Sequence, residues 1–339
     1  MRVLSTLYVK SHRAKVGLQK QALMVTSPEG KTRVPLESLD AVVLLGSAQV
    51  TSDALAACVE RGVRLASLRR NGRVRFVVGG PVGGNVHLRL AQTKAASDPG
   101  HVAALARWFV AGKLQNYRRL LLRWSWDARP IDRNHLRNQA EIIATRLDGL
   151  GGVVDGDRIR GIEGDATRRY FKGLAAQLTS TGAGLHFVGR SRRPPRDPVN
   201  ALLSFLYGLV TTELIGALDA VGLDPQIGYL HGVRSGRPAL ALDLLEEFRP
   251  AQADRLAVRL IARRQVRESH FVTTPGGACY LTDDGRSVVL SSYEDFKAEE
   301  VPHPLLGRDV PRWALPSLQA TLVARHLRGD LPAYPPFLI

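Results

Sequence analysis

The sequence predicts an α+β protein in which a β-sandwich-like N-terminal domain precedes a larger all-α domain. Alternating and β-branched runs, which are typical of strands, fill residues 1–80. The glycine-rich stretch "GGPVGGN" at 79–85 then interrupts the pattern, as a linker does. Beyond it, apolar residues recur at the three- and four-residue steps of amphipathic helices. We therefore predict a β domain over 1–80, a linker with a first helix over 81–100, and a helical domain over 101–339.

The β domain is expected to contain several strands and one short helix. Its strand-like runs are "LSTLYV", "KVGLQKQALMV", "LDAVVLLG", "VRLASL" and "VRFVVGG". Asn71 and Gly72 form a pair typical of a two-residue hairpin turn, between the last two runs. The helix is predicted over 52–62, with Ser52 as its N-cap and Gly62 as its C-cap.

The rest of the chain is predicted to be mainly helical. Helical periodicity covers residues 101–126, 133–150, 165–178 and 198–218. The loop "GRSRRPPRD" at 189–197 is strongly basic, and its prolines exclude a helix. We expect a small hairpin or irregular insert at 273–296 and a closing helix at about 312–328.

The charge of the chain predicts a polyanionic partner. There are 47 Lys and Arg residues against 31 Asp and Glu residues, which gives a net charge of +16. Arginine predominates, and its guanidinium group suits bidentate contacts with phosphate. Nucleic acid is therefore the predicted partner. The alternative is a soluble protein whose arginine content has no functional meaning.

The sequence also carries signs of a cytoplasmic protein. We find no long uninterrupted apolar run and no N-terminal signal region. Cys58 and Cys279 are far apart and lack metal-ligand spacing, so both read as ordinary thiols in a reducing compartment.

The stretch "GIEGDATRRYF" at 161–171 places a single glutamate, Glu163, between two glycines. A carboxylate near the start of a helix interacts well with the helix dipole, so a structural role is one interpretation. Gly164 argues against that role alone, because a glycine inside a first turn costs about 1 kcal/mol relative to alanine. A functional role for Glu163 is the other interpretation.

A second group of acids lies in "GYLHGVRSGRPALALDLLEEFRP" at 228–250. Pro238 suits a helix start and Pro250 is expected to end the helix. Asp243 and Glu246 are three residues apart and so share one helical face, which is rich in leucine. Carboxylates near a buried face need a partner, and that partner is either a metal ion or a base such as Arg237 or Arg249.

His231 favours the metal, because it lies just before this helix in a loop bracketed by glycines. One imidazole with carboxylates and no thiolate suits Mg²⁺ or Mn²⁺.

These stretches together resemble the CRISPR-associated integrase-endonucleases of spacer acquisition, the Cas proteins numbered one. The matching motifs are "E-G-x-A-x-x-x-Y-F" from Glu163, "G-x-x-H" ending at His231, and "A-L-x-x-D-L-x-E-x-F-R-P" over 239–250. Further matches are "LRLAQ" at 88–92, "DPVNALLSFLYGLV" at 197–210 and "YPPF" at 334–337. The resemblance runs in order over most of the chain.

The resemblance implies a dimerising β domain and a helical catalytic domain that binds the metal. Glu163, His231 and Glu246 would be the metal ligands, and Asp243 the supporting acid at the edge of the catalytic site. Gly164 and Ala166 would let the helices approach closely. Tyr170 and Phe171 read as core residues. The predicted DNA-binding residues are Arg168, Arg169, Arg190, Arg192, Arg193 and Arg196.

The implied chemistry is metal-dependent attack on a phosphodiester of double-stranded DNA. Attack by water makes the protein an endonuclease, and attack by the 3′-OH of a DNA fragment makes it an integrase that inserts new spacers at a CRISPR repeat. The implied partners are a second copy of the chain and a dimer of the small companion Cas protein numbered two. The alternatives are a structure-selective DNA repair nuclease and a non-catalytic architectural DNA-binding protein.

Overall fold

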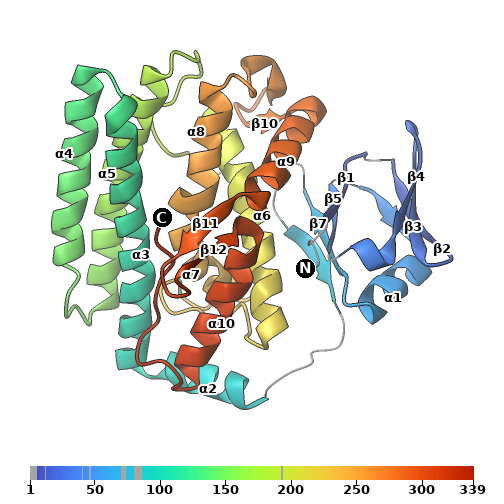
Figure 1. Cartoon of the computed structure of the whole chain (residues 1–339), viewed down its shortest axis with the longest axis horizontal. Coiled ribbons are helices and arrows are strands. Elements are labelled where there is room, and N and C mark those ends of the chain that lie inside the picture. The colour runs from blue at the N-terminus through green and yellow to red at the C-terminus, as the bar shows by residue number, and fades with distance from the viewer. Residues whose placement is uncertain are drawn as a thin grey trace. The chain divides into compact units, whose positions relative to one another are not determined.

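The computed structural model describes residues 6–11, 13–39, 41–45, 47–69, 74–79, 86–191 and 194–339. The chain divides into two compact units, Met1–Gly83 and Gly84–Ile339. The predicted order, with strand-built sheets first and a helical unit after them, is confirmed (Figure 1). The predicted turn at Asn71 and Gly72 lies outside the described residues, as does the predicted linker from residue 80 to residue 85.

Two four-stranded sheets form the first unit. One has the order β1-β5-β7-β8, in which only β8 is antiparallel to its neighbour, and the other has the order β4-β3-β2-β6. The first sheet consists of β1 (Thr6–Val9), β5 (Ala41–Leu45), β7 (Arg64–Leu68) and β8 (Val74–Val78). The second consists of β4 (Gly30–Pro35), β3 (Ala22–Ser27), β2 (Lys15–Gln19) and β6 (Gln49–Val50).

A shared core joins the two sheets of this unit. Val16 and Leu23 from one sheet belong to the same buried cluster as Leu44 and Leu65 from the other. The helix α1 (Ser52–Glu60) is where the sequence predicts it, but its N-cap is Thr51, whose hydroxyl accepts from Ala54 N at 3.3 Å, and not Ser52. A short 3₁₀ helix (Leu36–Ser38) lies between β4 and β5.

The second unit is a helical assembly with two small hairpins. Its helices are α2 (Val86–Ser97), α3 (Pro99–Asp127), α4 (Pro130–Asp148), α5 (Gly156–Ser180), α6 (Pro198–Val221), α7 (Ala239–Phe248), α8 (Arg255–Ala262), α9 (Asp283–Ala298) and α10 (Leu315–Leu327). One hairpin pairs β9 (Phe271–Thr273) with β10 (Cys279–Leu281), and the other pairs β11 (Glu300–His303) with β12 (Arg308–Pro311). Short 3₁₀ turns cover Glu268–His270 and Arg312–Ala314.

Two sequence-based expectations about these elements are wrong. Pro250 does not end the helix that begins at Ala239, because a π-helical segment η2 (Arg249–Asp254) carries the chain on into α8. The wider π turn accommodates a residue that lacks an N–H donor. The segment 273–296 contains the expected hairpin strand, but most of it is the regular helix α9.

The helix α6 is the one described helix that is long and apolar enough to cross a membrane, with a mean hydropathy of 1.7 over its most apolar window. Its polar residues Asn200 and Glu213 interrupt the apolar run, which is why the sequence shows no continuous one. The helix packs against α7 and α10, and most of that window is buried. This is the position of a core helix.

The helix α3 is the element that organises the candidate site. It packs against α4, α5 and α7 and contributes a long row of buried side chains, including Phe109, Tyr117 and Leu121. Gly173 of α5 lies close to α3, because an added Cβ there would lie 2.4 Å from Leu121 Cδ2. A larger residue there would have to displace the Leu121 side chain, so α5 packs closely against α3 at this position.

Candidate metal and nucleic-acid site

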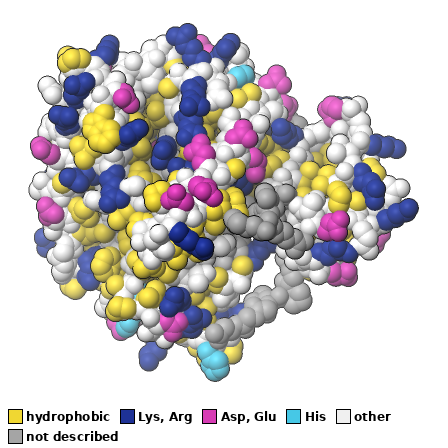
Figure 2. Space-filling view, viewed as in Figure 1, with side chains coloured by type: hydrophobic (Ala, Val, Ile, Leu, Met, Phe, Trp, Pro, Cys, Tyr) yellow, Lys and Arg dark blue, Asp and Glu magenta, His cyan; other side chains and the backbone are white. Residues whose placement is uncertain are grey.

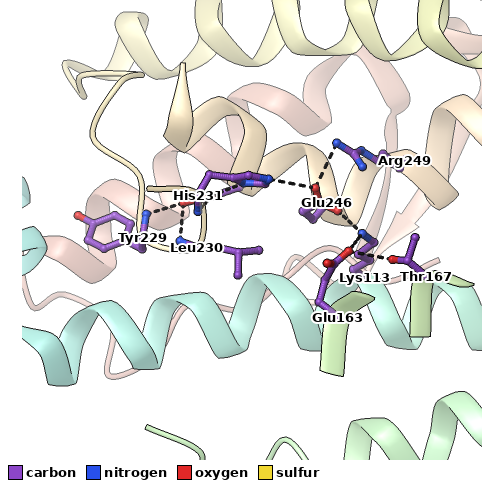
Figure 3. Close-up of polar contacts among 9 residues, drawn as sticks. Lys113, Glu163, Thr167, Tyr229, Leu230, His231, Glu246 and Arg249 are labelled. Carbon is purple, nitrogen blue, oxygen red and sulfur yellow. Dashed lines mark hydrogen bonds and ion pairs between the residues drawn. The ribbon is translucent and has the colours of Figure 1, made fainter. Parts of the chain in front are cut away.

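The ammonium group of Lys113 lies between two carboxylates that come from different helices. Lys113 is fully buried on α3 and forms ion pairs with Glu163 of α5 and Glu246 of α7 (Figure 3). Thr167, one turn beyond Glu163, donates its hydroxyl to Glu163 Oε1 at 2.8 Å. Two acids that are far apart in the sequence therefore converge on one positive charge.

His231 approaches the same group from the loop that precedes α7. Its Nδ1 lies 2.7 Å from Asp243 Oδ1, and its Nε2 lies 3.7 Å from Glu246 Oε1 (Figure 3). Since an ionised carboxylate only accepts hydrogen bonds, Nδ1 donates to Asp243, and Nε2 is the ring nitrogen directed at Glu246. A carboxylate behind the histidine is the usual support of a metal-binding imidazole.

Asp243 also holds the backbone of the histidine loop. Its side chain accepts hydrogen bonds from the backbone N–H of Tyr229 (2.6 Å), Leu230 (3.1 Å) and His231 (2.8 Å). Gly228 lets the loop reach α7, because an added Cβ there would lie 2.7 Å from the backbone of Ala239. In the "G-x-x-H" pattern, the glycine therefore permits the close approach of the backbone to α7, and the histidine carries the imidazole that Asp243 holds in place.

Positive neighbours keep both glutamates ionised. Burial alone would raise the pKa of Glu246, but Arg249, Lys113 and His231 together lower it to about 2. Arg249 Nη2 lies 3.2 Å from Glu246 Oε1. Burial likewise opposes ionisation of Glu163, and the Lys113 ammonium holds its pKa below the ordinary value in spite of the charge on Glu246.

The donor set fits a hard divalent cation. Two ionised carboxylates, Glu163 and Glu246, flank the Lys113 ammonium group, and the His231 imidazole lies beside Glu246; these are the kinds of group that Mg²⁺ or Mn²⁺ would use. In the described part of the chain no three acid, imidazole or thiol groups converge closely enough to share one ion. Lys113 lies between the two glutamates, so a metal ion would compete with this ammonium group.

The structure brings together the four predicted site residues Glu163, His231, Asp243 and Glu246. The alternative partner of these acids is a base, Arg237 or Arg249. Arg249 does pair with Glu246, whereas Arg237 has no ion pair with these acids among the described residues. The helix-start interpretation of Glu163 is wrong. The helix α5 begins at Gly156 with Asp155 as its N-cap, which places Glu163 two turns inside it.

The expected reason for Gly164 is also wrong. An added Cβ at Gly164 would meet no atom within 4 Å, so this glycine does not serve a close helix contact, although Ala166 is fully buried. Tyr170 and Phe171 are core residues, as expected, with 0% and 7% exposure.

The predicted DNA-binding arginines have different surroundings. Arg168 is largely exposed and pairs with Asp165 at 3.0 Å, whereas Arg169 is more buried and lies 4.0 Å from the same acid. Arg190 is bound within the fold, because its guanidinium donates to Asn200 Oδ1 at 2.6 Å and to Ser204 Oγ at 3.0 Å. Arg196 is exposed.

Arg192 and Arg193 lie outside the described residues.

Sequence reasoning missed two groups around the site. Lys113 has a visible signal, because it is a single lysine on the apolar face of α3, one turn from both Phe109 and Tyr117. Asp254 at the end of the π segment has none, since its role depends on tertiary contacts. It accepts hydrogen bonds from the hydroxyls of Tyr207 (2.6 Å) and Tyr170 (2.9 Å), and burial raises its pKa to about 6.

Comparisons with known proteins agree on one family. The sequence profile described as "CRISPR associated protein Cas1" matches residues 7–295. A relative from Moorella thermoacetica, named CRISPR-associated endonuclease Cas1 1, is 44% identical over 338 residues, which is 99% of this chain and 98% of the relative.

Two solved structures share the fold. A casposase bound to its integration product superposes with a TM-score of 0.84 at 20% identity, covering 98% of this chain and 93% of the casposase chain. A chain of a Cas6–RT–Cas1–Cas2 complex gives a TM-score of 0.81 at 22% identity, covering 99% of this chain and 36% of that longer one. At these identities the likeness concerns the fold alone. The profile match and the identity to the Moorella relative show that this chain belongs to the Cas1 family.

Proposed function

We propose that this chain is a divalent-metal-dependent DNA endonuclease and integrase that inserts new spacers into a CRISPR array in the cytoplasm. The observation that carries the proposal is that Glu163 and Glu246, from helices far apart in the sequence, share the buried Lys113 ammonium group, while His231 Nε2 lies 3.7 Å from Glu246 Oε1. The endonuclease names of relatives such as the one from Moorella thermoacetica support the same reaction class.

Glu163, His231 and Glu246 would hold Mg²⁺ or Mn²⁺. The bound cation would polarise a phosphodiester oxygen and lower the pKa of the attacking hydroxyl group. A metal ion bound by the two glutamates would take the place of the Lys113 ammonium group, which now pairs with both. The long flexible side chain of Lys113 allows that ammonium group to move aside.

The residues around these ligands have separate tasks. Asp243 orients His231 through the hydrogen bond to Nδ1, so that Nε2 stays directed at Glu246. Arg249 offsets the charge of Glu246 and lets two acids share a buried site. The reaction needs no protein nucleophile, because water or a DNA 3′-OH supplies the attacking oxygen.

The proposed partners are double-stranded DNA, a second copy of the chain, and a dimer of the small protein Cas2. The net charge of +16 supports a DNA partner. One structural neighbour belongs to a complex that contains both Cas1 and Cas2, and this supports the protein partner.

An integration assay tests the proposal. Supercoiled plasmid bearing a CRISPR repeat is incubated with a short DNA duplex and Mn²⁺, with and without the Cas2 partner, and the products are separated on gels. Joined products that depend on the metal, the duplex 3′-OH and the partner are expected. Cutting without joining would indicate a repair nuclease instead, and binding without either reaction would indicate an architectural protein.

A further inference from the structure

The buried face of α2 contains a polar residue that has no role in the site described so far. Leu88, Gln92 and Ala95 are the buried residues of this helix, so Gln92 lies in the middle of an otherwise apolar stripe. The opposite side of α2 is exposed, with residues such as His87 and Lys94. Figure 2 shows basic and histidine side chains at the lower edge of the second unit, where Figure 1 places α2. A buried carboxamide costs free energy unless it is hydrogen-bonded, so the partners of Gln92 indicate its role.

The carboxamide of Gln92 binds the backbone of the histidine loop, which joins α6 to α7. Its Nε2 donates to the backbone oxygens of Asp224 at 2.9 Å and Ile227 at 3.3 Å, and its Oε1 accepts from Asp224 N at 2.9 Å. The Tyr229 hydroxyl donates to the backbone oxygen of Gln92 at 3.3 Å. A carboxamide carries both donors and an acceptor, so neither an apolar side chain nor an ionised carboxylate of similar size could make all three of its bonds.

The histidine loop, at 222–238, is therefore held at two places. Gln92 holds the part before Gly228, and Asp243 holds the backbone and the imidazole of His231. The loop contains no helix or strand, so its buried backbone groups depend in part on side chains for hydrogen bonds. Asp243 belongs to α7, one of the two helices that the loop joins, whereas Gln92 fixes the loop to a third helix.

The helix α2 relates this attachment to the helix that carries Lys113. It packs against α3 and α10, and a single residue separates its end from the start of α3. Glu163 and Glu246 both pair with Lys113 on α3. The three proposed ligands thus share α3 as a support, the two glutamates through Lys113 and His231 through Gln92 and α2.

We propose that Gln92 is a positioning residue, which fixes the histidine loop so that His231 Nε2 stays within reach of a metal ion held by Glu163 and Glu246. This role rests on the proposed function, in which His231 is a metal ligand. Gln92 itself binds neither the metal ion nor DNA, and its effect on the site passes through His231. Loss of the Gln92 carboxamide should therefore weaken metal binding only where His231 is present.

A double-mutant cycle for Mn²⁺ binding tests this dependence. Free Mn²⁺ is measured by electron paramagnetic resonance in the presence of full-length wild type, Gln92→Met, His231→Ala or the double variant, without DNA. Methionine is similar to glutamine in size but makes none of the three hydrogen bonds. Gln92→Met should weaken Mn²⁺ binding by about tenfold in the otherwise unchanged protein, and by less than about twofold beside His231→Ala.

Gln139→Met is the matched control. Gln139 is also a buried glutamine on a helix, but it lies on α4, which packs against α3 and α5. The same change there should leave the Mn²⁺ affinity within about twofold of wild type. Gln92→Asn is a second test variant, which keeps a carboxamide but is one methylene too short to reach both Asp224 and Ile227. It should weaken Mn²⁺ binding in the same direction, and it takes the place of Gln92→Met if that variant does not fold.

Hydrogen exchange of the full-length protein provides a measurement without metal. Peptides from the histidine loop should exchange about tenfold faster in Gln92→Met than in wild type or Gln139→Met, because the loop loses the hydrogen bonds of the carboxamide.

Equal weakening by Gln92→Met with and without His231 would overturn the proposal, because it would show a general loss of structure. A Mn²⁺ affinity of Gln92→Met equal to that of Gln139→Met would also overturn it, and the proposed function would stand if His231→Ala alone still weakens Mn²⁺ binding. No effect of His231→Ala would instead refute the ligand set of the proposed function. Faster exchange in the histidine loop would then still support its attachment by Gln92, and unchanged exchange would refute it.

Discussion

Lys113 is a fully buried ammonium group with two carboxylate partners on different helices. Replacing it with methionine removes the positive charge that both acids share and leaves Glu163 and Glu246 close together. We expect Lys113→Met to lower the free energy of unfolding by about 3 kcal/mol without metal, because breaking a buried pair strands a charge. Chemical denaturation with and without Mn²⁺ checks this.

Added Mn²⁺ should restore part of the stability of Lys113→Met, because a divalent cation can replace the missing charge. A variant that is equally unstable in both conditions would show that the pocket between the glutamates does not accept a metal ion.

Asp254 predicts a dependence of stability on pH. Burial raises its pKa to about 6 in the folded protein, against 3.8 for the free side chain. The folded state therefore keeps a proton that the unfolded state releases between these values, so this group costs stability as pH rises through that window. Relative to wild type, Asp254→Asn should gain up to about 3 kcal/mol between pH 4 and pH 6. A constant stability difference across this range would show that the pKa of the Asp254 carboxyl group is not raised by burial.

The two kinds of site residue differ in how far the sequence reveals them. Glu163 and His231 are recognisable because local motifs surround them, and Asp243 and Glu246 share one helix face. Asp254 cannot be recognised in this way, because its partners Tyr170 and Tyr207 come from α5 and α6, and only the packed core places them together.

At the scale of elements, the C-terminal tail joins the two helices that carry Lys113 and Glu246. Asn116 Nδ2 on α3 donates to the backbone oxygens of Glu247 on α7 (3.0 Å) and Phe337 in the tail (2.9 Å). Glu247 in turn accepts from the Tyr334 hydroxyl and from Phe337 N at 2.6 and 3.0 Å. The motif "YPPF" thus links α3 to α7 through hydrogen bonds.

Gly112 provides a direct test of the packing of the C-terminal tail on α3. An added Cβ there would lie 2.5 Å from Pro336 Cβ, whereas an added Cβ at the exposed helical residue Gly161 meets nothing within 4 Å. We expect Gly112→Ala to lower the free energy of unfolding by about 1–3 kcal/mol through overpacking, and Gly161→Ala to raise it by up to about 1 kcal/mol through helix propensity. Thermal unfolding of both variants measures the difference. Equal shifts in the two variants would show that the tail does not pack on α3.

Hydrophobic periodicity predicts the helices well where one helix face is apolar, and poorly where proline, glycine or polar residues interrupt that pattern. The helices α3, α4 and α6 begin and end within a few residues of their predicted limits. Proline ordinarily stops a helix, but at Pro250 tertiary packing of the fully buried segment Arg249–Asp254 stabilises a π turn instead. The α9 helix contains Gly285 and several serines, so its helical signal is weak.

At the scale of the whole molecule, the first unit is expected to mediate dimerisation. Its β8 strand carries Phe76, which is 46% exposed on an edge of the β1-β5-β7-β8 sheet. Exposed edge strands pair readily with another chain. Sedimentation should therefore detect a dimer at micromolar concentration, and Phe76→Lys should shift the population toward the monomer. A wild-type protein that sediments as a monomer would contradict this prediction.

The central claim is that Glu163 is a metal ligand of a DNA-joining site, and the melting temperature of Glu163→Ala with and without Mn²⁺ tests it most directly. The variant should melt somewhat below wild type without metal, because buried Lys113 loses one of its two partners. Mn²⁺ should raise the melting temperature of wild type and leave that of the variant unchanged, while DNA affinity persists and plasmid strand transfer is lost. A variant that keeps both the Mn²⁺-induced shift and strand transfer would contradict the account.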